Sequence, residues 1–228
     1  MITSRKLVIA IDGPAGSGKS TIAARLAQNL GYINLESGAM YRALALKALE
    51  QDIALEDAEA LQRLAENSLM QLEPRGEGGN RVLLDGRDVS QRIREADVTV
   101  AASQVSVHPQ VRKVMVARQR ELGTNGGVVM EGRDIGTAVF PNAEVKIFLD
   151  ADPNVRAERR VLQGGSHSTE DVQRIGAEIA ARDERDRTRA TSPLVPAADA
   201  LFVDTTHKSI DMVVADLEAI VNKRVNSI

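Results

Sequence analysis

Short apolar runs alternate along the chain with longer segments whose hydrophobic residues recur at helical spacing. The runs predict buried strands at 7–11, 128–130, 145–150 and 200–204, and a weaker one at 32–35. The spacing predicts helices at 19–30, 38–51, 56–66, 91–103, 109–122, 153–163, 168–190 and 209–224. Strand–helix alternation of this kind favours an α/β fold, with a parallel sheet flanked by helices on both faces.

Two stretches depart from this alternation. Residues 69–90, LMQLEPRGEGGNRVLLDGRDVS, predict two short strands joined by a Gly-rich turn, an antiparallel insert in an α/β chain. Residues 153–190 form an Arg-rich helical segment broken by QGGSHS at 163–168. A Gly-Gly break between charged helices suits a mobile flap, and it suits a static surface hairpin equally well.

Composition narrows the class of protein. The chain has 228 residues, 43% of them hydrophobic and 27% charged, which suits one large globular domain. A net charge of −3 and 2% aromatic residues argue against binding to nucleic acid or to an anionic membrane. Cys is absent, which excludes thiol chemistry and suits a reducing cytoplasm, and no segment approaches the ~18 apolar residues of a membrane span. We therefore expect a cytoplasmic protein. No heptad pattern demands a partner subunit, so we expect it to be a monomer.

The segment GPAGSGKS at 13–20 decides the class, because it fits G-x-x-x-x-G-K-[ST] between a predicted strand and a predicted helix. Its glycines let backbone N–H groups turn inward toward phosphate oxygens, and the following helix presents its positive end to the same anion. Lys19 can reach the β- and γ-phosphates. We therefore predict that ATP is bound with Mg²⁺ by Gly13, Pro14, Ala15, Gly16, Ser17, Gly18, Lys19, Ser20 and Thr21.

The metal ion needs hard oxygen ligands. The hydroxyl of Ser20 is one candidate, and an acidic residue at the end of a neighbouring strand often assists. Glu131 ends an apolar strand and is followed at once by Gly132, so it is a better candidate than Asp150. A solvated strand end remains the alternative for both carboxylates.

Other nucleotide-binding proteins fit less well. No Asp is followed three positions later by Gly, so the D-x-x-G of a GTPase switch is missing. A kinase remains, and its acceptor decides what else it needs: an alcohol needs a carboxylate base, whereas a phosphorylated acceptor needs positive charge. Arg is suited to that task because its planar fork binds phosphate in a bidentate manner. Beyond the phosphate-binding loop, arginines stand at 42, 112, 133, 156, 159, 160, 182, 185, 187 and 189.

Residues 182–189, RDERDRTR, carry seven charges in eight positions. Runs of this kind usually form ion pairs on a solvated helix face. Arg182, Asp186 and Arg189 would lie on one face of a helix, at i, i+4 and i+7. The same spacing suits a surface that binds an anionic substrate, so the two interpretations stay open at this point.

The chain closely resembles the bacterial cytidylate (CMP/dCMP) kinases over residues 6 to 221. The resemblance rests on IDGPAGSGKST, ESGAMYRALAL, AASQVS, HPQVRKVMVARQR, EGRDIGTAVFPNAEVKIFLDA and RDERDRTRATSPLVPAADA, in this order. It implies one kinase domain over 1–228 with a P-loop core and a five-stranded parallel sheet. It also implies a monophosphate-binding region at about 37–105, which includes the insert at about 69–90, and a helical lid at about 155–190.

The resemblance further implies a role for each matching residue. Arg42 and Arg133 would hold the acceptor phosphate, and Tyr41 would form a wall of the pocket. Ser37, Arg112, Asp134 and Arg189 would surround the base, while Ser103, Arg182 and Asp186 would meet the sugar. Lys19, Arg133 and Arg182 would act in catalysis. Arg182, Asp186 and Arg189 would then point into the acceptor site, whereas Glu184 and Arg187 remain ion-pair residues.

The expected reaction is transfer of the γ-phosphoryl of Mg·ATP to CMP or dCMP. An Asp suits cytosine, because it accepts a hydrogen bond from the exocyclic N4 amine and repels the oxygen of uracil. The alternatives are a kinase for UMP or another small acceptor, and an ATP-dependent switch without catalysis.

Overall fold

The core of the fold is a five-stranded parallel sheet with the strand order β2-β6-β1-β7-β8, as shown in the computed structural model, which describes residues 6–74, 80–165, 168–225 and 227. This confirms the expected α/β architecture and also the weaker strand prediction at 32–35. The strands are β1 (Val8–Asp12), β2 (Ile33–Glu36), β6 (Val128–Gly132), β7 (Val145–Asp150) and β8 (Leu201–Asp204).

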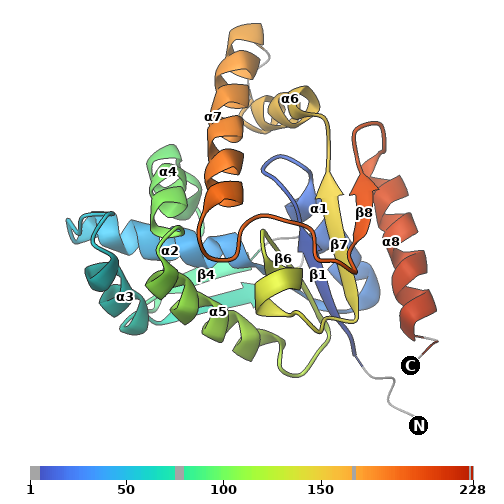
Figure 1. Cartoon of the computed structure of the whole chain (residues 1–228), viewed down its shortest axis with the longest axis horizontal. Helices are drawn as coiled ribbons and strands as arrows, with labels where there is room; N and C mark the ends of the chain where they lie inside the picture. Colours follow the sequence, from blue (N-terminus) through green and yellow to red (C-terminus); the bar gives the residue numbers. More distant parts are fainter. Residues whose placement is uncertain (1–5, 75–79, 166–167, 226, 228) are drawn as a thin grey trace.

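Helices cover both faces of this sheet because its strands carry apolar side chains on both sides. On one face, α1 (Lys19–Leu30) and α8 (Ile210–Val225) pack against β1 and β7, with Ile11, Leu26 and Leu217 fully buried between them. On the other face, residues of β1 and β6 pack against the π-helical turn η2 (Ile135–Val139). Figure 1 shows the sheet between these layers.

A second hydrophobic core lies beside the sheet, in the region predicted to bind the acceptor. It joins α2 (Ser37–Glu50), α3 (Ala58–Glu66), α4 (Ala96–Val105) and α5 (Pro109–Gly123). The expected helix at 91–103 is wrong at its start. A 3₁₀ turn, η1 (Arg92–Arg94), comes first, and extended Glu95 (φ −69°, ψ 157°) separates it from α4.

The insert forms a small antiparallel sheet of three strands, not two. The strands are β3 (Met70–Pro74), β4 (Asn80–Leu84) and β5 (Arg87–Asp88). Asp85 (φ 51°) and Gly86 (φ 82°) form the two-residue loop before the extra strand, and both have the positive φ of a type I′ hairpin turn. The predicted Gly-rich turn at 75–79 lies outside the described residues.

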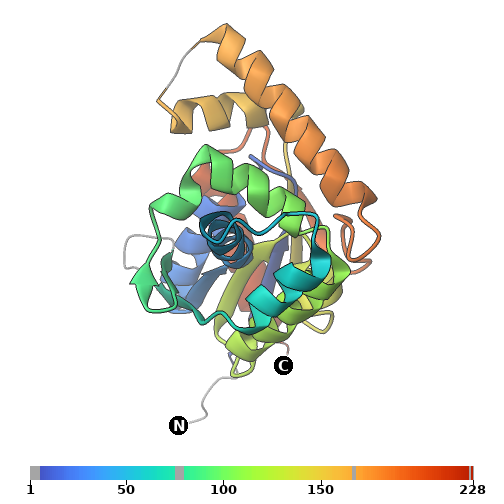
Figure 2. The same cartoon turned by 90° about the vertical axis from the view of Figure 1, so that its left-hand side faces the viewer.

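Two helices stand beyond the end of the sheet toward which the strands point (Figure 1). They are α6 (Pro153–Gln163) and α7 (Thr169–Thr188), which pack against each other and which we call the lid segment. Figure 2 shows α6 above the rest of the molecule and α7 descending from the top along its right-hand side. Of the break predicted at 163–168, residues 166 and 167 lie outside the described part, and the idea that the segment moves stays a prediction. None of the described helices combines the length and apolar character that a membrane crossing needs.

Candidate active site

The carboxyl ends of three neighbouring strands bring acidic residues together. In the parallel register Glu36 of β2 lies opposite Glu131 of β6, and Asp12 of β1 lies opposite Gly132. All three carboxylate residues are buried. Ligands bind at this edge of open α/β sheets, so the strand ends mark the place to look for the site.

The loop after β1 has the backbone geometry that a phosphate-binding loop needs. Gly13 (φ 149°) leaves no room for a side chain, because a Cβ there would lie 2.0 Å from the carbonyl oxygen of Leu149. Gly18 adopts a left-handed conformation (φ 91°) and caps α1. These glycines allow the loop to curl in front of the helix, whose free N–H groups attract an anion.

Lys19 follows directly and is turned back onto the loop. Its Nζ donates to the carbonyl oxygen of Pro14 (2.6 Å) and to Oγ of Ser17 (3.3 Å). Burial lowers the pKa of Lys19 to about 7, and the nearby charge of Arg133 adds to the effect. An anionic phosphate at the loop would favour the charged form of this lysine, as its predicted role in ATP binding requires.

Ser20 and Glu131 meet although they stand 111 residues apart, because Oγ of Ser20 donates to Oε1 of Glu131 (2.8 Å). Burial raises the pKa of Glu131, and the negative charge of Glu36 adds to this. A hydroxyl and a carboxylate are the hard oxygen donors that Mg²⁺ takes when nucleotide phosphates supply further ligands. The pair therefore fits the predicted metal ligands, while the described residues hold no cluster of three His, Cys, Asp or Glu that would bind a metal alone.

Asp12, which precedes the loop, has a structural role that the sequence analysis missed. Its two carboxylate oxygens accept hydrogen bonds of 2.7 Å from the backbone N–H groups of Ile135 and Gly136. Those residues follow Arg133 and Asp134 directly, so Asp12 ties the ATP side of the site to the predicted acceptor residues. Burial raises the pKa of Asp12 to about 6 although the two amide bonds oppose the shift.

We expect the native chain to lose unfolding free energy, relative to an Asp12→Asn variant, as the pH rises from about 4 to 7. The folded state binds this proton more tightly than the unfolded state, so the contribution is complete below the unfolded pKa. It is lost as the pH rises through about 6. At about 1.4 kcal/mol per pKa unit, the change is at most about 3 kcal/mol. Urea unfolding of both proteins at the two ends of this range measures it, and an unchanged difference would contradict the prediction.

The two predicted phosphate-binding arginines carry carboxylate partners. Arg42 pairs with Glu36, which lies 3.3 Å from Arg94 through its other oxygen. Burial opposes the charge of Glu36, but Arg42 and Arg94 outweigh it and lower its pKa. Arg133 donates through Nε to Asp186 (2.9 Å), which links the end of β6 to the lid segment.

The predicted base-binding residues form a buried cluster around Asp134. One oxygen of this carboxylate accepts from Arg112, whose guanidinium lies over the ring of Tyr41, 5.6 Å from its centroid. The other oxygen lies 3.4 Å from Nη2 of Arg189. Ser37, the fourth predicted base-binding residue, binds the backbone of β6 instead: its Oγ donates to the carbonyl oxygen of Glu131 (2.8 Å).

The predicted sugar-binding residues lie between α4 and α7. Asp186 binds Arg133 and lies 3.6 Å from Nη1 of Arg189, while Oγ of Ser103 accepts from Nε of Arg185 (3.2 Å). Arg182 has several positive charges near it, from Arg133, Arg42 and Arg160, together with the carboxylate of Asp186. Burial lowers its pKa to about 10, with Arg133 as the next cause, so it remains charged at neutral pH.

Buried polar atoms without a hydrogen bond gather in the predicted acceptor residues. Nine such side-chain atoms occur in the described part of the chain, and five belong to that set. They are Tyr41 Oη, Arg42 Nε, Arg112 Nε, Arg182 Nε and Arg189 Nη2. Because a buried polar group without a partner is costly, such a concentration of donors indicates a ligand site.

Other arginines that the sequence left open bind protein groups. Arg156 donates to the carbonyl oxygen of Ala15 (2.9 Å) and pairs with Asp183 of α7. Arg159 donates to the backbone and hydroxyl oxygens of Thr205 (2.7 and 3.0 Å). The sequence placed both among the arginines suited to phosphate, and it could not reveal these protein partners because they lie far along the chain.

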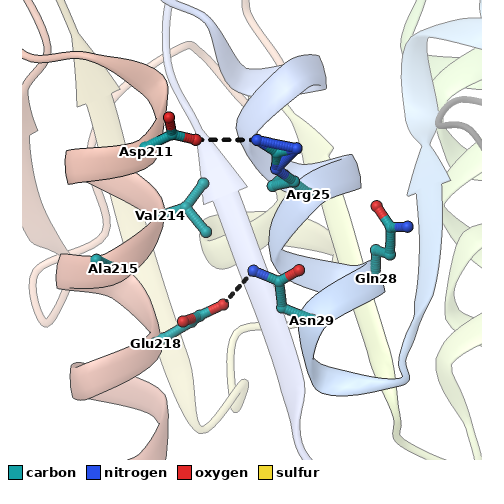
Figure 3. A pocket seen from close by; sticks show the side chains of 7 residues that line it. All are labelled: Arg25, Gln28, Asn29, Asp211, Val214, Ala215 and Glu218. Carbon is teal, nitrogen blue, oxygen red and sulfur yellow. Dashed lines mark hydrogen bonds and ion pairs between the residues drawn. The ribbon is translucent and has the colours of Figure 1, made fainter.

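Two hollows open beside α1. One, of about 490 Å³, lies between α1 and α8. Figure 3 shows its lining side chains, among which Arg25 pairs with Asp211 and Asn29 donates to Glu218. A second one, of about 730 Å³, reaches from the start of α1 to the end of β2. It is lined by Ser20, Thr21, Ala24, Arg25, Gln28, Asn34, Glu36, Arg94, Ile210 and Asp211. The second hollow therefore borders the predicted metal ligand Ser20, whereas the first lies further along α1.

Comparison with known proteins places the chain in a family. A family model described as "Cytidylate kinase" matches residues 9–223. The chain belongs to the cytidylate kinase family. A cytidylate kinase of Geobacillus sp. (strain WCH70) is 50% identical over 218 residues, 95% of this chain and 97% of the relative. One of Enterococcus faecalis is 48% identical over 220 residues, 96% of this chain and 97% of the relative.

Solved structures support the kinase fold at low sequence identity. A gluconokinase from Sinorhizobium meliloti matches with a TM-score of 0.50 and 15% identity, over 98% of this chain and 95% of that chain. An uncharacterized protein from Eubacterium ventriosum matches with a TM-score of 0.51 and 12% identity, over 96% of this chain and 99% of that chain. Membership of the cytidylate kinase family confirms the expected enzyme class, a phosphotransferase that binds nucleotides.

Proposed function

We propose that this cytidylate kinase transfers the γ-phosphoryl group of Mg·ATP to the 5′-phosphate of CMP or dCMP. The observation that carries the proposal is the group of five buried polar atoms without a hydrogen bond in Tyr41, Arg42, Arg112, Arg182 and Arg189. Four of the five are guanidinium nitrogens, and these can donate to the phosphate, sugar and base of a nucleoside monophosphate. The family relationship supports the same acceptor.

The phosphate donor would bind at the loop after β1. The loop amides and Lys19 bind the β- and γ-phosphates, and Ser20 and Glu131 hold the magnesium ion with them. When bound, Mg²⁺ neutralises charge on the phosphate oxygens and orients them for transfer. The Nζ of Lys19, which contacts Pro14 and Ser17 of the loop, is placed to donate to phosphate oxygens bound there.

The acceptor would bind between β6, α2 and the lid segment. Arg42 and Arg133 bind its phosphate, whose second pKa of about 6 leaves it largely dianionic and nucleophilic without a protein base. Two anions must approach each other for transfer. The charges of Lys19, Arg133 and Arg182 offset this repulsion and stabilise the transferring group in the transition state.

Asp134 would select cytosine. Its carboxylate accepts a hydrogen bond from the exocyclic amine of cytosine, whereas the O4 of uracil offers only repulsion. Arg112 and Arg189 hold this carboxylate from two sides and keep it in place. Tyr41 fixes Arg112 in turn, since the guanidinium lies over its ring.

Replacing Asp134 by Asn tests this account of base selection. We expect the ratio of kcat/KM for CMP to kcat/KM for UMP to fall by at least about tenfold, because Asn can donate to uracil as well as accept from cytosine. Steady-state rates with both nucleotides give the ratio. Asp97→Asn is a matched control, since Asp97 is an exposed carboxylate of α4 that pairs with Arg92. An Asp134→Asn enzyme that still discriminates like the wild type would contradict the base-reading role.

A further inference from the structure

Asp183 is the buried carboxylate in the charged run 182–189 that the proposed roles leave out. It is 1% exposed, whereas the next residue, Glu184, is exposed to solvent. A charged side chain is buried to this extent only where other groups satisfy it. The partners of Asp183 therefore indicate why this carboxylate is buried.

Those partners lie on the phosphate-binding loop and on α6. Oδ1 of Asp183 accepts from the backbone N–H of Ala15 (3.0 Å), and its Oδ2 accepts from Nη1 of Arg156. Arg156 also donates to the carbonyl oxygens of Ala15 (2.9 Å) and Ala151 (3.1 Å). The backbone N–H of Ala15 is thus bound by Asp183 of α7, and its carbonyl oxygen by Arg156 of α6. Asp183 and Arg156 also pair with each other, which closes the network.

The loop and α6 also touch directly. A Cβ on Gly16 would lie 2.9 Å from the carbonyl oxygen of Arg156, so no side chain fits between them. Gly16 follows Ala15 in the loop, and its φ of 76° is one that residues with side chains rarely adopt. The contact of the lid segment with the loop is therefore close and specific, and Asp183 lies at its centre.

Arg182 adjoins this contact along the chain. It precedes Asp183 in α7, and its Nε is buried without a hydrogen-bond partner in the described structure. The charges of both residues shift the pKa of Lys19 in the loop: Asp183 raises it and Arg182 lowers it. Because its Nε has no partner, the placement of the Arg182 guanidinium follows from the placement of its helix.

We propose that Asp183 is a positioning residue for Arg182: it fixes α7 on Ala15 and Arg156, and thereby places the Arg182 guanidinium beside the transferring phosphoryl group. This inference rests on the proposed function, which gives Arg182 its catalytic role. A purely structural role for Asp183 is the competing explanation, since breaking any buried ion pair destabilises a fold.

A double-mutant cycle separates the two explanations. We expect Asp183→Asn to lower kcat at least about tenfold in the wild-type background and less than about threefold in an Arg182→Ala background. Asn carries an NH2 group in place of one carboxylate oxygen. This donor would face another donor, either Nη1 of Arg156 or the N–H of Ala15, so one hydrogen bond is lost. Glu184→Gln, the neutralisation of the neighbouring exposed carboxylate, should stay within about twofold of wild type.

Thermal unfolding of all variants supplies the second readout. Asp183→Asn should lower Tm to a similar extent in both backgrounds, because the buried pair is lost in both. If kcat falls by the same factor in both backgrounds, or not at all in the wild type, the positioning role is wrong. If Arg182→Ala alone keeps the wild-type kcat, the catalytic role of Arg182 in the proposed function fails, and this inference fails with it.

Should Asp183→Asn not fold, Arg156→Lys provides a milder version of the same test. Lys keeps the positive charge beside Asp183, but its single ammonium cannot reproduce the contacts of the guanidinium with two carbonyl oxygens. The same cycle with Arg182→Ala is expected to show a loss of kcat that depends on Arg182. A loss that is independent of Arg182 overturns the proposal.

Discussion

Replacing Arg133 by Met is expected to lower kcat by about a thousandfold, which corresponds to about 4 kcal/mol of transition-state stabilisation. Burial works against the charge of Arg133, but the carboxylates of Asp186, Glu131 and Asp183 outweigh it and raise its pKa. The side chain is therefore a permanent, preorganised cation between the acceptor phosphate and the loop. Met matches the aliphatic part of the arginine side chain and carries no charge, so the variant removes the guanidinium while keeping an unbranched side chain in its place.

The affinity for ATP should hardly change in this variant, because the loop amides and Lys19 remain. Steady-state kinetics for kcat and calorimetric titration with ATP measure the two quantities separately. Arg187→Met is the matched control, since Arg187 is an exposed arginine of α7 to which we assign no role. A near-normal kcat in Arg133→Met would show that another residue neutralises the transferring group.

Replacing Lys19 by Met is expected to lower kcat/KM for ATP by at least about a hundredfold. Lys19 is the cation of the loop itself, and its Nζ lies within hydrogen-bond distance of Pro14 and Ser17, where phosphate oxygens would arrive. Without it, the loop amides alone offset the charge of the β- and γ-phosphates. The kcat should fall as well, because the lysine also binds the γ-phosphoryl group in the transition state.

Lys208→Met is a suitable control for this variant, because Lys208 is an exposed lysine that pairs with Asp216 (2.8 Å). Stability must be followed in parallel. Burial already disfavours the charge of Lys19, so its removal should not lower Tm. A Lys19→Met enzyme with wild-type kcat/KM would contradict the assignment of the loop as the ATP site.

The sequence predicted those parts of the fold that depend on local patterns. The five strands of the main sheet are short apolar runs, and the order of apolar and helical segments implies a parallel sheet. The third strand of the insert was missed although Asp85–Gly86 is a typical type I′ dipeptide, because only two residues follow in the strand. The break at Glu95 was missed because nothing in the helical spacing announces it.

The site residues likewise divide into those that a local sequence pattern reveals and those that it does not. The phosphate-binding motif around Lys19 can be recognised from the sequence, since one continuous segment supplies the loop, the lysine and the hydroxyl. Asp12 and Asp183 could not be found, because each binds a backbone N–H that stands more than 100 residues away: Ile135 for the first, Ala15 for the second. In the sequence Asp183 is one of seven charges in a run. Only the packing of α7 on the loop distinguishes this buried carboxylate from exposed Glu184.

The most direct test of the whole account is ADP release with Mg·ATP against CMP, dCMP, UMP, AMP and GMP, with a control lacking any acceptor. We predict strong turnover with CMP and dCMP and weak turnover with UMP, because Asp134 favours a pyrimidine with an amine in place of the uracil oxygen. We expect negligible turnover with the purine nucleotides, as the family relationship implies. Turnover with UMP equal to that with CMP would contradict the base-reading role of Asp134. ADP release that does not depend on an acceptor would contradict the proposed phosphoryl transfer itself.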